Sequence, residues 1–302
     1  MKAKHYAYLA GLIDGDGCVD AYVAQSDGST WYRVYLAVNS VEHKVIKRLE
    51  ELFGGKGHKR ERPHYKHGFI WEWKLIVKQD VNDLIEQMIP YLVLKREQAR
   101  LAVQFLNLPR GCPKDREALI REIQRLNQKE TSEGELRDIG QLRWPYLAGL
   151  MDAEGTFTVR RDERDNYVHY GIWARLANKN RHVIDWLEKF FGIESTQDAT
   201  SYYWPLPYER KEKERFILKL LPYLVTKKDQ AKVLLEYIRM GDERNPAKRE
   251  ALYQRCFDLN HPVPALAVTT LCNRRPQPAP ESVSRVELSP GSDSEHSGPV
   301  DR

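Results

Sequence analysis

A ten-residue segment that occurs twice constrains the fold of this chain more than any other feature of its sequence. Residues 8–17 read YLAGLIDGDG, and residues 146–155 read YLAGLMDAEG. Each copy begins with apolar and small residues and ends with acidic residues beside glycine. Self-similarity of this kind indicates two structural repeats that pack on one another.

Three further blocks repeat downstream in the same order. The matched ranges are 36–55 with 174–193, 89–106 with 221–238, and 113–127 with 246–260. The copies are offset by 138 residues at the opening segment, 139 at Asn39 and Asn178, 132 at Lys95 and Lys227, and 133 in the last block. The sequence therefore predicts a tandem duplication. The falling offset predicts that the second copy is shortened between residues 192 and 221.

Hydrophobic patterning within each copy predicts a mixed α+β unit with an antiparallel sheet. Runs such as TWYRVYLAVN and YGIWARLAN are rich in aromatic and β-branched residues and are bounded by turn residues, as strands are. The expected order is helix, strand hairpin, helix, strand hairpin, helices. We predict an N-terminal half over 1–130, a polar linker over 131–142, and a C-terminal half over 143–260. Residues 261–302 are rich in Pro, Ser and Gly without periodicity, which predicts a disordered tail.

The small residues of the repeated segment predict that its two copies form helices in contact. A glycine inside a helix costs about 1 kcal/mol relative to alanine, so Gly11 and Gly149 need a compensating reason, and close approach of another helix supplies one. The acids at the helix ends, Asp16 and Glu154, would then lie side by side. Two carboxylates that repel each other at helix C-termini favour a hard divalent cation such as Mg²⁺.

A single copy would have a simpler interpretation, as an amphipathic helix with a DGDG turn or an isolated calcium loop. The EF-hand pattern fails because its later oxygen-bearing positions are absent. The repetition of small residues and acids in matching places favours a shared site between two halves.

Charge and composition narrow the class of partner. The formal net charge is +5, and residues 58–74 and 159–182 interleave Arg, Lys and His with Tyr and Trp, a pattern that suits phosphates and bases. The four cysteines are scattered, which indicates neither a disulfide framework nor a zinc site. The sequence shows no apolar run long enough to span a bilayer and no secretory signal, so we expect an intracellular protein without membrane contact.

The duplicated motif resembles that of the LAGLIDADG homing endonucleases in their two-motif, single-chain form. The match lies at LAGLIDGDG (9–17) and LAGLMDAEG (147–155), and the downstream blocks extend it over residues 5 to about 260. The resemblance implies two αββαββα halves related by a pseudo-twofold axis. Each half would have a saddle-shaped antiparallel sheet that lies in the major groove of double-stranded DNA.

The resemblance also implies a set of site residues. The last acids of the motifs, Asp16 and Glu154, would bind the Mg²⁺ or Mn²⁺ ions that activate water and stabilise the leaving oxygen, with help from the carbonyls of Gly15 and Ala153. Lys95 and Lys227 match the family's active-site lysine. The polar position that orders the attacking water would be occupied by Asn39 and Asn178.

Strand alternation predicts which side chains face DNA. A register shifted by one residue would move each of them to the opposite face. In the strands after the motifs we expect Asp20, Tyr22 and Ala24, then Thr158, Arg160 and Asp162. Arg60 and Arg62 should share one face of the third strand, where guanidinium groups suit guanine readout, and Arg175 is a similar candidate.

The resulting hypothesis is a metal-dependent, site-specific double-strand DNA endonuclease that acts as a monomer on a long asymmetric target. The alternatives are an intron maturase that binds intron RNA, or a non-cleaving DNA-binding protein on the same fold. Relatives without cleavage commonly lack a motif acid or a lysine, and here all four residues are present. The compartment would be a bacterial or archaeal cytoplasm, or a chloroplast or mitochondrion.

Overall fold

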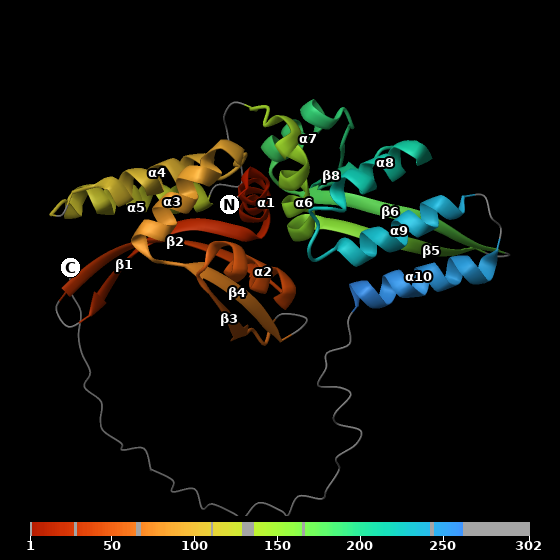
Figure 1. Ribbon diagram of the computed structural model, residues 1–302, viewed down its shortest axis with the longest axis horizontal. Helices are drawn as coiled ribbons and strands as arrows, with labels where there is room; N and C mark the ends of the chain where they lie inside the picture. The colour runs from red at the N-terminus through yellow and green to blue at the C-terminus, as the bar shows by residue number, and fades with distance from the viewer. Residues whose placement is uncertain are drawn as a thin grey trace, which may run out of the picture. The chain divides into compact units, whose positions relative to one another are not determined.

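The two copies of the repeated segment form helices α1 (Ala3–Asp16) and α6 (Arg143–Glu154), which lie side by side (Figure 1). Each ends at its acidic residue, and the glycine that follows begins a strand. The computed structural model describes residues 2–26, 29–64, 68–109, 111–128, 136–164, 167–241 and 245–261.

The elements of the two copies follow one another in the same order, as the sequence predicts. After α1 come β1 (Gly17–Ser26), β2 (Ser29–Ser40), α2 (His43–Phe53), β3 (Lys56–Glu61), β4 (Phe69–Leu75), α3 (Lys78–Met88), η1 (Ile89–Tyr91), α4 (Arg96–Asn107) and α5 (Pro113–Gln128). The short η2 (Gly140–Leu142) precedes α6. The second copy continues with β5 (Gly155–Arg164), β6 (Tyr167–Asn178), α7 (Arg181–Phe191), β7 (Thr196–Gln197), β8 (Tyr202–Pro205), α8 (Arg210–Leu220), α9 (Lys228–Met240) and α10 (Pro246–Asn260).

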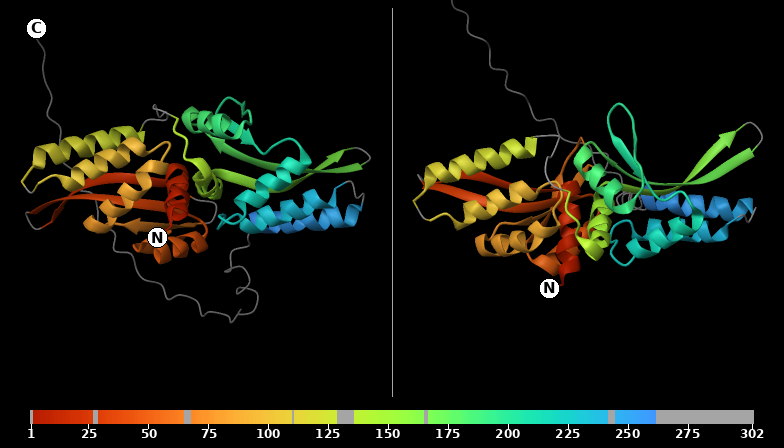
Figure 2. Two further views of the ribbon diagram at one scale, coloured as in Figure 1. Left: turned by 45° about the horizontal axis from the view of Figure 1, so that its top comes forward. Right: turned by 90° about the horizontal axis from the view of Figure 1, so that it is seen from above.

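Each copy builds one four-stranded antiparallel sheet. The strand orders are β1-β2-β4-β3 and β5-β6-β8-β7, so the two topologies are identical. Helices from the same copy cover one face of each sheet, as the two views of Figure 2 show. This is the α+β architecture with a tandem repeat that the sequence predicts.

Alternation along the strands separates a core face from an open face. In the first sheet Val19 pairs with Leu36 and is fully buried, whereas the next pair, Asp20 and Tyr35, points to the other face. In the second sheet Phe157 and Val159 are buried, and the residues between and beyond them are not. The open faces therefore carry polar and aromatic side chains.

The predicted shortening of the second copy falls in its second hairpin. Strands β7 and β8 have two and four residues, where β3 and β4 have six and seven. Helix α7 ends at the left-handed Gly192, and α8 begins only at Arg210. The difference predicted between residues 192 and 221 is thus confirmed, and it lies before α8.

Met1–Pro262 form one compact unit that contains both sheets. The division into 1–130, 131–142 and 143–260 stays a prediction within it. Apart from His261, the predicted disordered tail over 261–302 lies outside the described residues. In the described part of the chain, every helix is too short or too polar to cross a membrane.

Candidate active site

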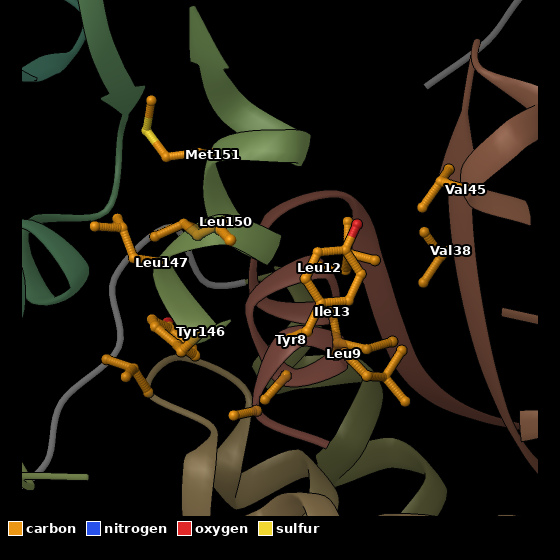
Figure 3. Close-up of a cluster of buried hydrophobic side chains, with 14 of the residues drawn as sticks. Tyr8, Leu9, Leu12, Ile13, Val38, Val45, Tyr146, Leu147, Leu150 and Met151 are labelled. Atoms are coloured by element: carbon orange, nitrogen blue, oxygen red, sulfur yellow. The ribbon is translucent and has the colours of Figure 1, made fainter. Parts of the chain in front are cut away.

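Helices α1 and α6 approach each other at their glycines. A Cβ atom on Gly11 would lie 2.0 Å from the carbonyl oxygen of Tyr146, and one on Gly149 would lie 2.1 Å from the carbonyl oxygen of Tyr8. No side chain larger than hydrogen fits at that distance, so the predicted role of the two glycines is confirmed. Figure 3 shows the apolar side chains of both helices around this contact, and Leu9 and Leu147 among them are fully buried.

The contact brings the acidic ends of the two helices together. A Cβ atom on Gly15 would lie 2.4 Å from the Ala153 Cβ and 3.4 Å from the Glu154 Cγ. Burial, followed by the charge of Asp16, raises the pKa of the Glu154 carboxyl, while Lys227 and Lys95 lower it. The pKa of Asp16 is also raised, because protein packed around it displaces solvent, although its side chain remains exposed. The two predicted acids therefore share one electrostatic environment.

Each predicted lysine lies against the end of the motif helix in its own half. The Lys95 Nζ donates to the carbonyl oxygens of Ile13 at 2.6 Å, Gly17 at 2.8 Å and Asp14 at 3.2 Å. Burial lowers its pKa, and the nearest carboxylates, Asp14 first, oppose that shift.

Lys227 repeats the arrangement in the second half. Its Nζ donates to the carbonyl oxygens of Met151 at 2.9 Å and Ala153 at 3.0 Å, and burial lowers its pKa as well. A cation at a helix C-terminus stabilises the helix dipole. The carbonyl of Ala153, which the resemblance assigns to metal, is thus already hydrogen-bonded to the lysine through one lone pair.

Two buried acids in the motifs escaped the sequence analysis as functional residues. Asp14 and Asp152 are 3% and 7% exposed, and each accepts hydrogen bonds from the backbone that precedes α4 or α9. They place the two lysines. The signal was present, since both motif copies have an aspartate two residues before their last acid, but only the last acid matched a known role.

The equivalence of Asn39 and Asn178 is wrong by one residue. Strands β2 and β6 end at Ser40 and Asn178, which are 138 residues apart like the motifs themselves. Each of these two side chains accepts a hydrogen bond from the amide two residues on: Ser40 Oγ from Glu42 at 3.0 Å, and Asn178 Oδ1 from Asn180 at 2.8 Å. Asn178 therefore starts the turn into α7, whereas Asn39 lies on the opposite face of β2, paired with Glu72. The sequence match paired the two residues because both are asparagine, although strand alternation puts them on different faces of their sheets.

Comparison with solved structures places this arrangement among known folds. A structure of I-SmaMI bound to an uncleaved DNA target with calcium ions covers 84% of this chain and 98% of that one, with a TM-score of 0.65 at 12% identity. A structure of the LAGLIDADG homing endonuclease I-GzeII in complex with its DNA target covers 86% and 98%, with a TM-score of 0.61 at 13% identity. This chain has the two-motif LAGLIDADG fold. The fold that the repeated segment led us to expect is thereby confirmed.

Sequence comparison gives a match over a shorter stretch of this chain. DNA endonuclease I-CvuI of Chlorella vulgaris is 28% identical over 106 residues, which are 33% of this chain and 63% of that protein. The chain therefore matches less than two thirds of the length of this curated relative. No family model matches the chain.

The open face of the first sheet holds Tyr22 and Arg60. Tyr22 packs edge-on against Tyr35 with ring centroids 5.7 Å apart. Arg60 pairs with the Glu72 carboxylate at 3.0 Å, so its guanidinium already has an acidic partner. Arg62 is exposed, but it follows β3, which ends at Glu61. The Arg62 amide still donates to the Gly68 carbonyl oxygen at 2.8 Å, which continues the β3–β4 pairing by one residue, so the expectation that Arg60 and Arg62 share one face stays a prediction.

The open face of the second sheet holds Thr158, Arg160 and Arg175. Thr158 lies opposite Trp173 in the ladder. Arg175 is flanked by two rings, with its guanidinium carbon 4.4 Å from the Trp173 centroid and 3.9 Å from the Tyr203 centroid. Arg160 lies 5.1 Å from the Trp173 centroid and pairs with Asp162 at 2.9 Å. These aromatic contacts are features that strand alternation alone could not predict.

Proposed function

We propose that this chain is a site-specific double-strand DNA endonuclease that hydrolyses one phosphodiester in each strand of a long asymmetric target. The observation that carries the proposal is the meeting of Asp16 and Glu154 at the joined ends of α1 and α6, between two sheets with open faces. Two similar but unequal halves favour a target with two unequal half-sites.

The acid pair fits a divalent cation, for which we propose Mg²⁺ or Mn²⁺. Within the described residues no group of three or more His, Cys, Asp or Glu side chains is arranged to hold a metal ion by itself. Asp16 and Glu154 would therefore hold the ion together with the Gly15 and Ala153 carbonyls, water and phosphate oxygens, the mixed set that Mg²⁺ accepts. When bound, the ion supplies an activated water and charge stabilisation of the leaving oxygen.

The lysines would act on the reaction as fixed positive charges. An ammonium group has three donors, and all three of Lys95 are directed at backbone carbonyls. Such a lysine is held in place and offsets negative charge that builds up on the phosphate. We propose the same role for Lys227.

The partner we propose is double-stranded DNA bound by one copy of the chain. The α1–α6 contact inside one chain supplies the interface that would otherwise require a dimer. The open-face residues Tyr22, Arg60, Thr158, Arg160 and Arg175, with Arg62 at the edge of the first sheet, would contact bases and phosphates. The protein would act in the bacterial, archaeal or organellar compartment that holds its target.

The proposal is tested by incubating the protein with a library of long duplexes and Mg²⁺ and sequencing the cut ends. We expect one asymmetric site to be cut in both strands. Asp16→Asn and Glu154→Gln should each abolish cutting while binding persists. Glu97→Gln, which changes an exposed ion pair on α4, serves as the matched control. A protein that cuts no duplex, yet binds structured intron RNA tightly, would overturn the proposal in favour of the maturase alternative.

A further inference from the structure

Two buried tyrosines each donate a hydrogen bond across the contact between the halves. The Tyr8 hydroxyl donates to the Asp152 Oδ2 at 2.8 Å, and the Tyr146 hydroxyl donates to the Asp14 Oδ2 at 2.9 Å. Tyr8 is 5% exposed and Tyr146 is fully buried. Each motif helix thus supplies the donor for the acid of the other one.

The acid that accepts from Tyr146 also holds the segment that carries Lys95. Asp14 accepts from the backbone amides of Val93 at 2.7 Å, Leu94 at 3.1 Å and Lys95 at 2.9 Å. The Lys95 ammonium then reaches back to the carbonyl oxygens at the end of α1. A tyrosine of the second half is therefore two hydrogen bonds away from the backbone of the first half's lysine.

The second half has the same chain of contacts with one change. Asp152 accepts from the amides of Val225 at 2.7 Å and Lys227 at 2.9 Å, and from the Thr226 hydroxyl at 2.7 Å. Its cross-half donor is Tyr8. The Thr226 hydroxyl takes the place that the Leu94 amide has in the first half, so each aspartate accepts three hydrogen bonds besides the one from its tyrosine.

The tyrosines are suited to act as permanent neutral donors. Burial and the facing aspartate raise the pKa of both hydroxyls well above the ordinary value for tyrosine. A buried carboxylate that loses one hydrogen-bond donor loses part of the interaction that compensates for its burial. The backbone amides that it holds would then be fixed less firmly.

We propose that Tyr8 and Tyr146 are positioning residues, each of which fixes the active-site lysine of the opposite half through the buried aspartate. The inference rests on the proposed endonuclease function for its effect on cutting, and on the geometry alone for its effect on the lysine segments. It makes each lysine's placement conditional on the joining of both halves.

The test compares Tyr146→Phe with Tyr8→Phe by hydrogen exchange and by strand-resolved cutting. In Tyr146→Phe the amides of residues 93–95 should exchange about tenfold faster, while those of Val225 and Lys227 stay protected. Tyr8→Phe should show the reverse, with faster exchange at Val225 and Lys227 and protection kept at residues 93–95. With the target duplex and Mg²⁺, the two variants should slow cutting of different strands. The control is Tyr237→Phe, which removes a hydroxyl that donates to the Tyr170 carbonyl oxygen at 2.8 Å and should change neither readout.

Equal acceleration of both segments in either variant would overturn the inference, because it would reveal a general loss of stability at the helix contact. Unchanged exchange in both variants would overturn it too. If the wild-type protein cuts no duplex, the proposed function fails, yet the exchange pattern still decides whether the tyrosines position the lysine segments.

Discussion

The carboxyl groups of Asp16 and Glu154 lie in one environment, where the protein packed around them makes their ionised forms less favourable. The pKa of Glu154 is raised above the ordinary value of 4.5, first by burial and then by Asp16. The folded protein therefore retains a proton that the unfolded chain would release. The stability that this group contributes is fully present below pH 4.5, and it is lost as the pH rises through the raised pKa. Without metal, ionisation of Glu154 beside Asp16 opposes folding.

Glu154→Gln should therefore stabilise the metal-free protein while it destroys activity. The amide cannot ionise, so the free energy of unfolding in urea at pH 7 should exceed that of the wild type, and the difference should shrink toward pH 4. Cutting of the target should fall by more than about a hundredfold. Adding Mg²⁺ should raise the melting temperature of the wild type and not of the variant. A variant less stable than the wild type at pH 7 would contradict this account.

A second acid, Asp198, is shifted in the opposite direction. Its carboxylate accepts from the Tyr203 hydroxyl at 2.6 Å and from the amides of Thr200 and Ser201 at 2.8 and 2.9 Å, and these bonds, the Tyr203 one first, lower its pKa to about 2. The stability it contributes is present above pH 3.8 and lost as the pH falls through about 2.

Tyr203→Phe should raise the pKa of Asp198 toward 3.8, because its strongest hydrogen-bond donor is removed. The measurement is an NMR titration of the side-chain carboxyl carbon. Tyr202→Phe, which changes the neighbouring ring, should leave the midpoint where it is. The hydrogen bond from the Tyr203 hydroxyl to Asp198 also holds the Tyr203 ring beside Arg175. If the pKa of Asp198 does not change in Tyr203→Phe, this hydrogen bond does not form, and Arg175 loses a contact that would fix its position.

Between elements, the contact of α1 with α6 leaves no room for a methyl group. Gly11→Ala would place its Cβ 2.0 Å from the Tyr146 carbonyl oxygen. The Cβ is bonded directly to the backbone of α1 and the oxygen belongs to the backbone of α6, so neither atom can move without its helix. We expect a loss of about 1–3 kcal/mol in the free energy of unfolding, despite alanine's better helix propensity. Gly171→Ala is the control, because a Cβ there would meet only the His169 ring at 3.6 Å. Equal stability of the two variants would mean that the helices can separate at no cost.

The elements themselves were accessible from the sequence because their signals are local. Hydrophobic period, turn residues and the repeated segment predicted the helices, hairpins and antiparallel sheets, and the small residues predicted the helix contact. The faces of β1 and β5 followed from a period of two. The same two-residue alternation shows why the equivalence of Asn39 with Asn178 is wrong. The two positions were matched because both are asparagine, whereas the strand register pairs Asn178 with Ser40.

What the sequence could not predict depends on contacts between distant residues. The bonds from Tyr8 and Tyr146 to aspartates in the other half join positions more than a hundred residues apart. The pairing of Arg60 with Glu72 and the rings around Arg175 likewise require the three-dimensional register. Such contacts are set by how the halves and strands pack, which no local pattern reports.

For the molecule as a whole, the unequal second hairpins predict an uneven dependence on the target. Strands β3 and β4 extend the first sheet farther than β7 and β8 extend the second. Base substitutions in the outer part of the first half-site should weaken binding by about 1–3 kcal/mol per pair, and those in the outer part of the second should weaken it less. Binding titrations with duplexes substituted one pair at a time measure both profiles. Two equal profiles would contradict the expectation.

The reciprocal hydrogen bonds from Tyr8 to Asp152 and from Tyr146 to Asp14 also decide which parts of this protein can be replaced with those of a relative. An engineer who replaces one whole half with that of a relative separates Tyr8 from Asp152 and Tyr146 from Asp14, and both acids must then find new donors in the incoming chain. Grafting at the ends of β1, β2, β5 and β6 leaves the helix pair and both buried acids together. New recognition surfaces are therefore best introduced as hairpins on a retained pair of central helices.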